Sequence, residues 1–424
     1  MNFFCIKVCV ILFISILSTS CISPFNEIGL PYKGWEKGEF DIHHIYTGRG
    51  ESSFLIFPDA TSMLIDAGDW DPKDYDKMCE LLPDNSRRSG EWIARYILRV
   101  NPFKEQVDYL MISHFHNDHI GDSSNPVLST QRRNPDYILT GITEVGEYIR
   151  FKKVIDRGFP DYQYPLPIAD PDVDNYKAFI NWKRKKEGLI PESFDIGNSS
   201  QIVLLNDKGK YSELFQIQNL AANGRIWTGN GKETINYYDL NSANRDGEQN
   251  ENSKSIGIKI NYGPFSYFTA GDISGTLLDG DGSKINLENE IAKICGSVDV
   301  CKANHHAYKD AMTEGFLKKI QASAYIIPVW DHEHIQPVIM KRMASYSPHS
   351  ENPTIYPTRF PYHLKDKYGK EPWINSVCQE DGHIVIKIFD EGKKYKIYVL
   401  SAKDEKSTVQ AVYGPFSSTV QDGN

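Results

Sequence analysis

Cysteine is scarce in this sequence, and its spacing excludes one common kind of metal site. The chain has 7 cysteines in 424 residues, and no pair shows the Cys-x-x-Cys spacing of thiolate zinc sites. Four cysteines follow the first 21 residues, namely Cys79, Cys295, Cys301 and Cys378. They would permit disulfides in an oxidising compartment, although buried free thiols are the simpler expectation.

Positive charge is also in short supply. Lysine and arginine number 47 against 56 aspartates and glutamates, so the formal net charge is −9, or −10 without the leader that carries Lys7. Proteins that bind nucleic acid or anionic membranes broadly gain affinity from lysine and arginine placed against phosphates. The acidic balance argues against such a protein. It leaves a phosphoester substrate open, because bound cations make a cleft locally positive.

The apolar run at the amino terminus, Val8 to Leu17, is too short for a transmembrane helix. It follows Lys7 and precedes three small residues, which predicts a secretory leader over residues 1–21. The end of this leader resembles a bacterial lipoprotein cleavage site before Cys21, except that Leu17 lies four residues before the cysteine instead of three. We therefore expect export and a lipid anchor in a bacterial envelope. A retained anchor, or a periplasmic or secreted protein, is the alternative.

The rest of the chain predicts a linker and one large domain. Residues 22–40 are rich in proline, glycine and charge without periodicity, which is typical of a linker. From residue 41 to 424, short strands mixed with helices predict an α/β (α+β) fold with two sheets sandwiched between helices. Residues 123–250 are irregular apart from one helix at 176–186, and we interpret them as an insertion. The other expected helices are 91–99, 287–294, 314–321 and 337–343, and the expected strands are 41–47, 53–58, 62–67, 107–112, 256–262, 265–270, 324–329, 384–389 and 394–400.

A histidine cluster follows the apolar strand 107–112. His114, His116, Asp118 and His119 lie within six residues, although the whole chain has only 12 histidines. Imidazole and carboxylate ligands suit zinc, manganese or iron, and the absence of thiolates leaves the choice of metal open. An ion with a free coordination position lowers the pKa of its water towards about 7, and a pair of ions also holds substrate oxygens. The cluster therefore predicts a site for one or two divalent ions that activates water.

The pattern His-x-His-x-Asp-His after a strand resembles the signature of the metallo-β-lactamase superfamily, and most of all the soluble hydrolase domain of ComEC-type competence proteins. Four further stretches match that domain in the same order. They are Gly50 to Ser53 with Met63 to Gly68, Phe268 to Asp272, Lys302 to Ala307, and His334 to Pro337. The resemblance implies a four-layer αββα sandwich and covers about residues 41–345, without the insertion.

The resemblance also assigns roles to single residues. It implies that His114 and His116 hold a first ion, and that Asp118, His119 and His306 hold a second. It makes Asp272 a bridge between the ions, with Asp66 and His305 as supporting residues behind the ligands. His305 and His306 could exchange roles. Asp118 would also accept a proton from the nucleophile, and His334 would bind metal or the leaving phosphate, or cap the next helix.

Two departures from the family pattern bear on metal occupancy. Many superfamily members take a third histidine for the first ion from the segment between the cluster and the bridging aspartate. No histidine lies between His119 and Asp272 here, so the first site would be weak or completed by another group. The usual Gly-Gly after the cluster is Gly121-Asp122.

The resulting hypothesis is a metal-dependent hydrolase that cleaves a phosphodiester or related ester with metal-bound hydroxide. Opening of a lactone or β-lactam is an alternative, because the same nucleophile attacks acyl carbonyls. A cell-surface binding protein with a vestigial metal site is a second alternative. Nucleic acid as a substrate rests on family analogy alone.

Overall fold

The computed structural model describes residues 27–70, 77–124, 134, 136–237, 251–275, 277–278, 284–347 and 351–419. The predicted leader, residues 1–21, and the first part of the predicted linker lie outside this range. None of the helices within it is long and apolar enough to cross a bilayer.

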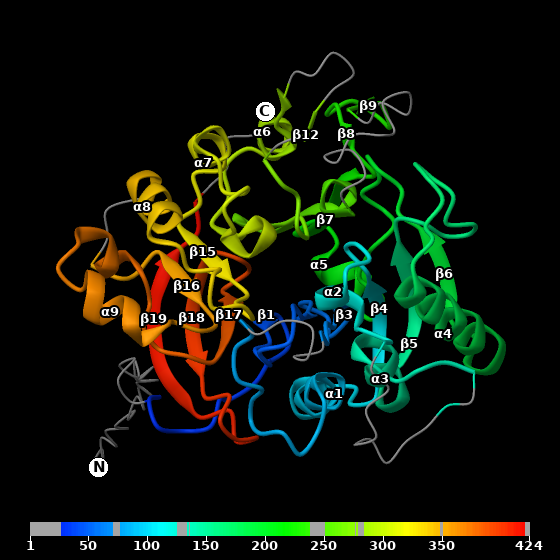
Figure 1. The fold of residues 1–424 in the computed structure, drawn as a ribbon, viewed down its shortest axis with the longest axis horizontal. Helices are drawn as coiled ribbons and strands as arrows, with labels where there is room; N and C mark the ends of the chain where they lie inside the picture. Colours follow the sequence, from blue (N-terminus) through cyan, green and yellow to red (C-terminus); the bar gives the residue numbers. More distant parts are fainter. Residues whose placement is uncertain are drawn as a thin grey trace, which may run out of the picture.

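Two large mixed sheets form the centre of the molecule (Figure 1). Within the described residues, the first sheet has nine strands in the order β19-β18-β17-β1-β2-β3-β4-β5-β6, antiparallel as far as β3 and parallel from β3 to β6. Its strands are β1 Phe40–His44, β2 Ser53–Ile56, β3 Ser62–Ile65, β4 Gln106–Met111, β5 Arg150–Asp156, β6 Ile190–Ser193, β17 His383–Phe389, β18 Lys394–Leu400 and β19 Val409–Ser417.

The second sheet has eight strands within the same residues, in the order β16-β15-β14-β11-β10-β7-β8-β9. The strands β11, β14, β15 and β16 run parallel, whereas β11, β10, β7, β8 and β9 pair antiparallel. Its strands are β7 Phe215–Ala222, β8 Arg225–Trp227, β9 Thr234–Asn236, β10 Gly257–Tyr262, β11 Phe265–Thr269, β14 Val300–Lys302, β15 Ala324–Ile327 and β16 Ile355–Pro357. A short ladder pairs β12 Leu277–Leu278 with β13 Lys284–Ile285.

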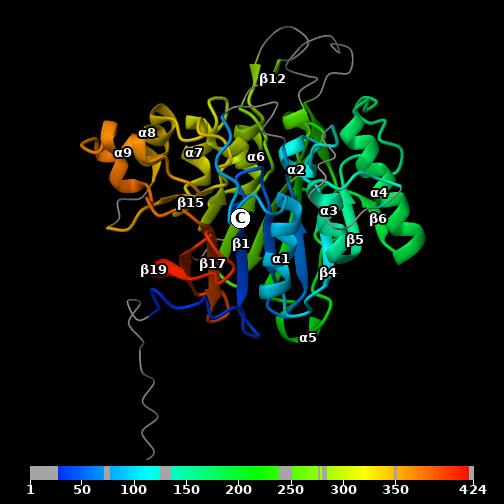
Figure 2. The same ribbon diagram turned by 60° about the horizontal axis from the view of Figure 1, so that its bottom comes forward.

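Helices cover the outer face of each sheet (Figure 2). On the first sheet these are α1 Ser89–Val100, α3 Gly141–Tyr148 and α4 Pro171–Glu187, and on the second α6 Leu287–Cys295, α7 Glu314–Ile320 and α8 Pro337–Tyr346. The remaining helices are α2 Asn117–Ile120, α5 Lys208–Tyr211 and α9 Tyr362–Tyr368. Local sequence explains α4 well, because Asp170 caps its first amides, Pro171 begins it and Gly188 ends it in the left-handed conformation.

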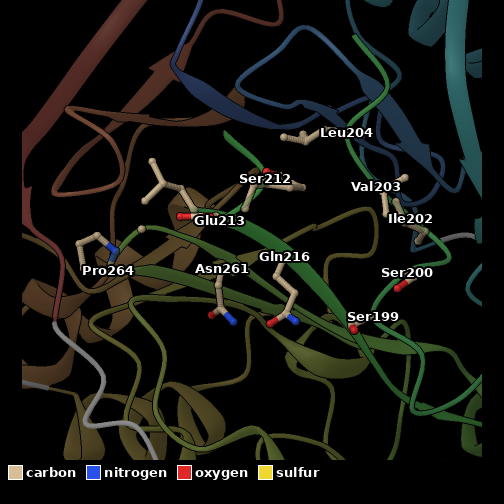
Figure 3. A pocket seen from close by; sticks show the side chains of 13 residues that line it. Ser199, Ser200, Ile202, Val203, Leu204, Ser212, Glu213, Gln216, Asn261 and Pro264 are labelled. Atoms are coloured by element: carbon tan, nitrogen blue, oxygen red, sulfur yellow. The ribbon is translucent and has the colours of Figure 1, made fainter. Parts of the chain in front are cut away.

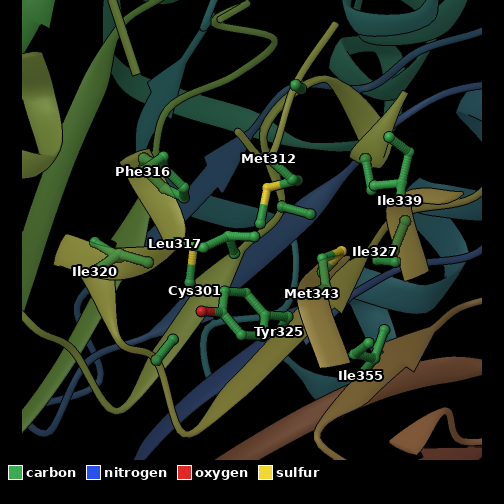
Figure 4. Close-up of a cluster of buried hydrophobic side chains, with 14 of the residues drawn as sticks. Cys301, Met312, Phe316, Leu317, Ile320, Tyr325, Ile327, Ile339, Met343 and Ile355 are labelled. Atoms are coloured by element: carbon green, nitrogen blue, oxygen red, sulfur yellow. The ribbon is translucent and has the colours of Figure 1, made fainter. Parts of the chain in front are cut away.

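Three apolar cores separate these four layers. One lies between the sheets, where Ile42 and Leu55 meet Ile258 and Ile260, and the other two lie between each sheet and its helices. Figure 4 shows the core beneath α7 and α8, in which Phe316, Leu317 and Met343 pack on strand residues. The predicted αββα sandwich is therefore confirmed.

The structure corrects the predicted insertion. Residues 123–250 contain β5 and β6 of the first sheet and β7, β8 and β9 of the second. The strand β5 was hidden in the sequence because its charged side chains pair across the sheet: Lys152 contacts Asp108 at 2.6 Å and Lys153 contacts Glu192 at 2.8 Å. The helix expected at 176–186 is the end of α4.

The described part of the predicted linker is also attached to the domain. The Gly29 amide donates to the Val409 carbonyl at 2.9 Å, and the Tyr32 hydroxyl donates to Asp41 at 2.7 Å. Glu27 pairs with Lys396 at 2.6 Å. Residues 27–39 thus pack against the carboxyl-terminal strands, and only residues 22–26 of that prediction lie outside the described range.

We expect Leu317→Ala to lower the free energy of unfolding by about 2–5 kcal/mol, because it empties a fully buried position on α7. Urea unfolding measures this change. The matched control is Lys318→Ala on the same helix, whose side chain is 57 % exposed and should change stability by less than about 0.5 kcal/mol. Equal effects of the two substitutions would contradict this packing.

Candidate metal centre

The predicted ligands lie where parallel strands end. The 113–119 loop follows β4, Asp272 follows β11 and His306 follows β14. Because β3 and β4 are parallel neighbours in one sheet, and β11 and β14 are parallel neighbours in the other, each pair presents its loops at one edge of its sheet. Contacts across the two sheets show that these edges meet: His306 lies beside Asp118.

Asp66 organises the histidine loop from behind. One carboxylate oxygen accepts the Ser113 amide at 2.7 Å, and the other accepts the Ser113 hydroxyl at 2.6 Å and lies 2.8 Å from His119 Nδ1. Because a carboxylate only accepts hydrogen bonds, His119 Nδ1 is the donor. In the neutral ring the lone pair of His119 is therefore on Nε2, which faces Asp118 and Asp272.

His306 is held in the same manner. Its Nδ1 donates to the Pro328 carbonyl at 2.8 Å, so its lone pair is also on Nε2. The Trp330 indole N–H, 3.2 Å away, donates to that same Nε2. Two imidazoles from different sheets thus present acceptor atoms to one point.

Two carboxylate oxygens face these imidazole atoms. Asp272 Oδ2 lies 3.2 Å from His119 Nε2 and 3.1 Å from His306 Nε2. Asp118 Oδ2 lies 3.4 Å from His119 Nε2 and 3.1 Å from His306 Nε2. Ligands at 2.0–2.1 Å around a tetrahedral zinc ion are about 3.3–3.4 Å apart. The four Asp–His distances therefore match the ligand spacing around a single divalent cation, and without positive charge between them the two carboxylates would repel each other.

The electrostatics of the group agree with this fit. Burial lowers the pKa of both imidazoles, but Asp272 and Asp118 raise it by more, well above the ordinary value for His119 and to about 9 for His306. Burial likewise raises the pKa of Asp118 and Asp272, and the imidazoles lower it by more, to well below the usual carboxyl value. The carboxylates stay ionised, and the group strongly favours a bound positive charge.

Glu51 and Lys302 belong to the site but were not predicted as site residues. Among the described residues, the one group whose ligand atoms all lie within 4.8 Å of one another consists of Glu51, His119, Asp272 and His306. Lys302 Nζ lies 2.8 Å from Glu51 Oε2 and 3.6 Å from Asp272 Oδ1, and it donates to the Gly271 carbonyl. This buried lysine holds the outer oxygen of Asp272, so that the other oxygen faces the imidazoles. The signal in the sequence that could have identified Lys302 as a site residue is its charge inside an apolar strand.

His114 and His116 form a separate pair. Their facing nitrogens, Nε2 and Nδ1, are 3.1 Å apart, and His114 is buried beside His119 with ring centroids 4.0 Å apart. Neither histidine belongs to the four-residue group described above. The structure thus places all four ligand-type residues of the loop together: Asp118 and His119 lie within 3.4 Å of the Asp272 and His306 side chains, and His116 lines the same cavity.

The remaining predicted residues line or support a cavity of about 370 Å³ that opens onto the four-atom group. His334 stacks on His306 with centroids 4.6 Å apart and planes 3° apart, and burial keeps its pKa well below the ordinary value, so the ring is neutral. His305 is held by Asp310 at 2.7 Å, and it lines the cavity with Asp118, Asp272 and His334.

A larger groove lies elsewhere and carries none of the predicted residues. It has a volume of about 900 Å³ between residues 199–204, 212–216 and 261–264 (Figure 3). Its polar side chains are serines, amides and the single carboxylate of Glu213. This lining offers no metal-ligand cluster, so the smaller cavity is the candidate site.

Comparison with known proteins finds one family model that matches part of the chain. Residues 46–191 match the family model of the metallo-β-lactamase superfamily, and no curated protein matches. Together with the four layers, this match confirms the predicted metallo-β-lactamase fold. The resemblance to ComEC-type hydrolases stays a prediction.

Similar solved structures overlap only weakly. A mutant of the CmlA β-hydroxylase has 11 % identity and a TM-score of 0.39, and the match covers 84 % of this chain and 55 % of that one, about half its length. A diphosphatase of the PhnP family has 11 % identity, a TM-score of 0.33 and coverages of 82 % and 97 %. A metal-dependent hydrolase of the β-lactamase superfamily has 12 % identity, a TM-score of 0.33 and coverages of 83 % and 100 %. Overlaps this weak say nothing of the chemistry of this chain.

We expect Lys302→Met to lower the free energy of unfolding of the metal-free protein by about 3–5 kcal/mol, because it leaves Glu51 as an uncompensated buried charge. Adding Glu51→Gln should recover at least about half of that loss. Urea unfolding in the presence of a chelator measures both variants. A single substitution costing under about 1 kcal/mol would show that the ion pair is not formed.

Proposed function

We propose that this protein is a metal-dependent hydrolase acting on a phosphodiester or related ester. The observation that carries the proposal is the group of four acceptor atoms from Asp118, His119, Asp272 and His306, two of them locked by hydrogen bonds behind the ring. Imidazole and carboxylate ligands without thiolate suit zinc, and also manganese or iron. A divalent ion held there supplies Lewis acidity and lowers the pKa of water towards about 7.

The residues around the ion have separate roles in this proposal. Asp118 Oδ2 faces both imidazoles, so we assign Asp118 as a ligand, and only its other oxygen is available for the predicted acceptance of a proton. His334, neutral and stacked on His306, is suited to hydrogen-bond a substrate oxygen. His305 keeps its Nδ1 on Asp310 and shapes the wall.

The charge of the cavity supports a diester over other anions. Lysine and arginine are absent from its lining within the described residues, whereas Asp118, Asp272 and Asp331 are present. A diester carries one negative charge, which the metal centre itself neutralises. A phosphomonoester or the carboxylate of a β-lactam would need a further cation on the wall. A neutral lactone meets no such objection and remains the second candidate.

Two features of the proposal rest on sequence alone. Export and lipid attachment at Cys21 depend on residues outside the described range. Nucleic acid as a substrate depends on family analogy, and the lining of the cavity adds no support for it.

We expect wild-type protein to hydrolyse bis(p-nitrophenyl) phosphate, to lose this activity with a chelator and to regain it with zinc or manganese. The variants His119→Ala and His306→Ala should lose bound metal and more than about 100-fold of the rate, because substitutions behind the ligands alone cost 10- to 100-fold. Elemental analysis and release of p-nitrophenolate measure the two effects. His363→Ala, at an exposed histidine, is the matched control.

The double variant His114→Ala and His116→Ala separates the two halves of the loop. We expect it to keep about one metal ion per chain, because Asp118, His119, Asp272 and His306 are unchanged. Loss of all metal from this variant would mean that the His114–His116 pair holds the tighter ion. Unchanged activity in all ligand variants would refute the hydrolase.

A further inference from the structure

A wall of rings runs along one side of the metal cavity. Trp70, Tyr308 and Trp330 line it together with His305 and His334. The rings contact one another in sequence: Trp70 lies 5.2 Å from Trp330, Trp330 4.9 Å from His334, and His334 6.1 Å from Tyr308, measured between centroids. The wall therefore extends from the four-atom group, where His334 stacks on His306, to the outer part of the cavity.

Two of these rings are not core residues. Trp330 is buried and donates a hydrogen bond to His306, so a structural role accounts for it. Trp70 and Tyr308 are partly exposed, although a large ring at a solvent-facing position leaves apolar surface in water. Each lies a few residues beyond the site, Trp70 after the Asp66 turn and Tyr308 two residues after His306. Both rings thus line the cavity within a few residues of the metal-ligand candidates.

The same wall is poor in positive charge. Three lysines near it in the described part of the chain are already engaged: Lys302 pairs with Glu51, Lys77 pairs with Glu333 at 2.6 Å, and Lys309 lies over the Tyr308 ring at 5.3 Å. A polyanion such as a nucleic-acid strand needs a row of cations along its backbone. The described lining consists instead of aromatic and imidazole side chains, amides and carboxylates.

We propose, resting on the hydrolase function above, that the substrate is a phosphodiester with a flat, uncharged ring next to the phosphate, and that Trp70 and Tyr308 select this ring. An aryl group and a nucleobase share this chemistry. Stacking on an aromatic face favours a flat ring over a saturated group of similar size.

Binding of phosphonate monoesters to the zinc-loaded protein tests the proposal without turnover. Ethyl phenylphosphonate, ethyl cyclohexylphosphonate and ethyl methylphosphonate carry one charge each and differ only in the group on the stable P–C bond. We expect the phenyl compound to bind roughly 3- to 10-fold tighter than the other two in calorimetry. Thymidine 5′-methylphosphonate distinguishes a nucleobase from an aryl source, and a thymidine decamer tests the polyanion.

Variants locate the preference on the two rings. Trp70→Leu and Tyr308→Leu should bring the ratio of phenyl to methyl affinity towards about 1, while elemental analysis shows unchanged zinc because His119 and His306 are intact. Trp70→Phe and Tyr308→Phe keep a ring and should keep most of the preference. If the Phe variants keep the preference, it comes from stacking on a ring and not from a general change in the shape of the cavity.

The outcomes separate the two proposals. Equal affinity for phenyl and methyl compounds, tighter binding of cyclohexyl, tighter binding of the decamer, or no phosphonate binding would each overturn ring selection. Metal-dependent hydrolysis of bis(p-nitrophenyl) phosphate would still stand in those cases. If the protein binds the phenyl compound selectively but hydrolyses no diester, the proposed hydrolase function would be wrong, while the ring-binding site would stand.

Discussion

The site depends on one electrostatic conflict, the approach of two imidazole lone pairs to two carboxylate oxygens. Asp66 and the Pro328 carbonyl hold His119 and His306 through Nδ1, so neither ring relieves the conflict by turning over without losing a buried hydrogen bond. The distances of 3.1–3.4 Å leave the conflict to be resolved by a proton or a cation. A divalent ion satisfies all four atoms together, whereas protons satisfy them in pairs.

The four atoms come from both sheets, so the distances between them depend on how rigidly the two sheets are packed together. Asp118 and His119 belong to a loop of the first sheet, and Asp272 and His306 follow strands of the second. The inter-sheet core fixes the spacing between the two edges. Glu51 from the first sheet and Lys302 from the second add a buried ion pair across the same boundary. Such a pair contributes little to net stability, but either charge left alone in the interior is strongly destabilising. The pair therefore favours the alignment of the two sheets in which both charges meet.

Sequence reasoning found residues that the structure brings together because they are polar residues placed directly after apolar strands. The spacing in the 114–119 loop predicted a metal site, and the resemblance to a family brought in Asp66, Asp272 and His306, which the structure gathers in one place. Glu51 and Lys302 escaped because their role appears only when two distant strands face each other. The strand β5 escaped for a similar reason: Lys152 and Lys153 interrupt its apolar pattern, and their partners Asp108 and Glu192 lie on neighbouring strands. Ion pairs between residues far apart in the chain produce no periodic pattern of polar and apolar residues, so periodicity in the sequence does not reveal them.

The two halves of the histidine loop differ in the support they receive. His119 has Asp66 behind it and two carboxylates in front, whereas the facing nitrogens of His114 and His116 have each other at 3.1 Å. Lys302 lies at the outer oxygen of Asp272, so a second ion would have to share the oxygen that already faces His119 and His306. In the proposed function, an ion at the four-atom group would have four protein donors, whereas an ion at the histidine pair would have two and would need a substrate oxygen or water to complete it. Occupancy of the second position would then depend on what is bound in the cavity.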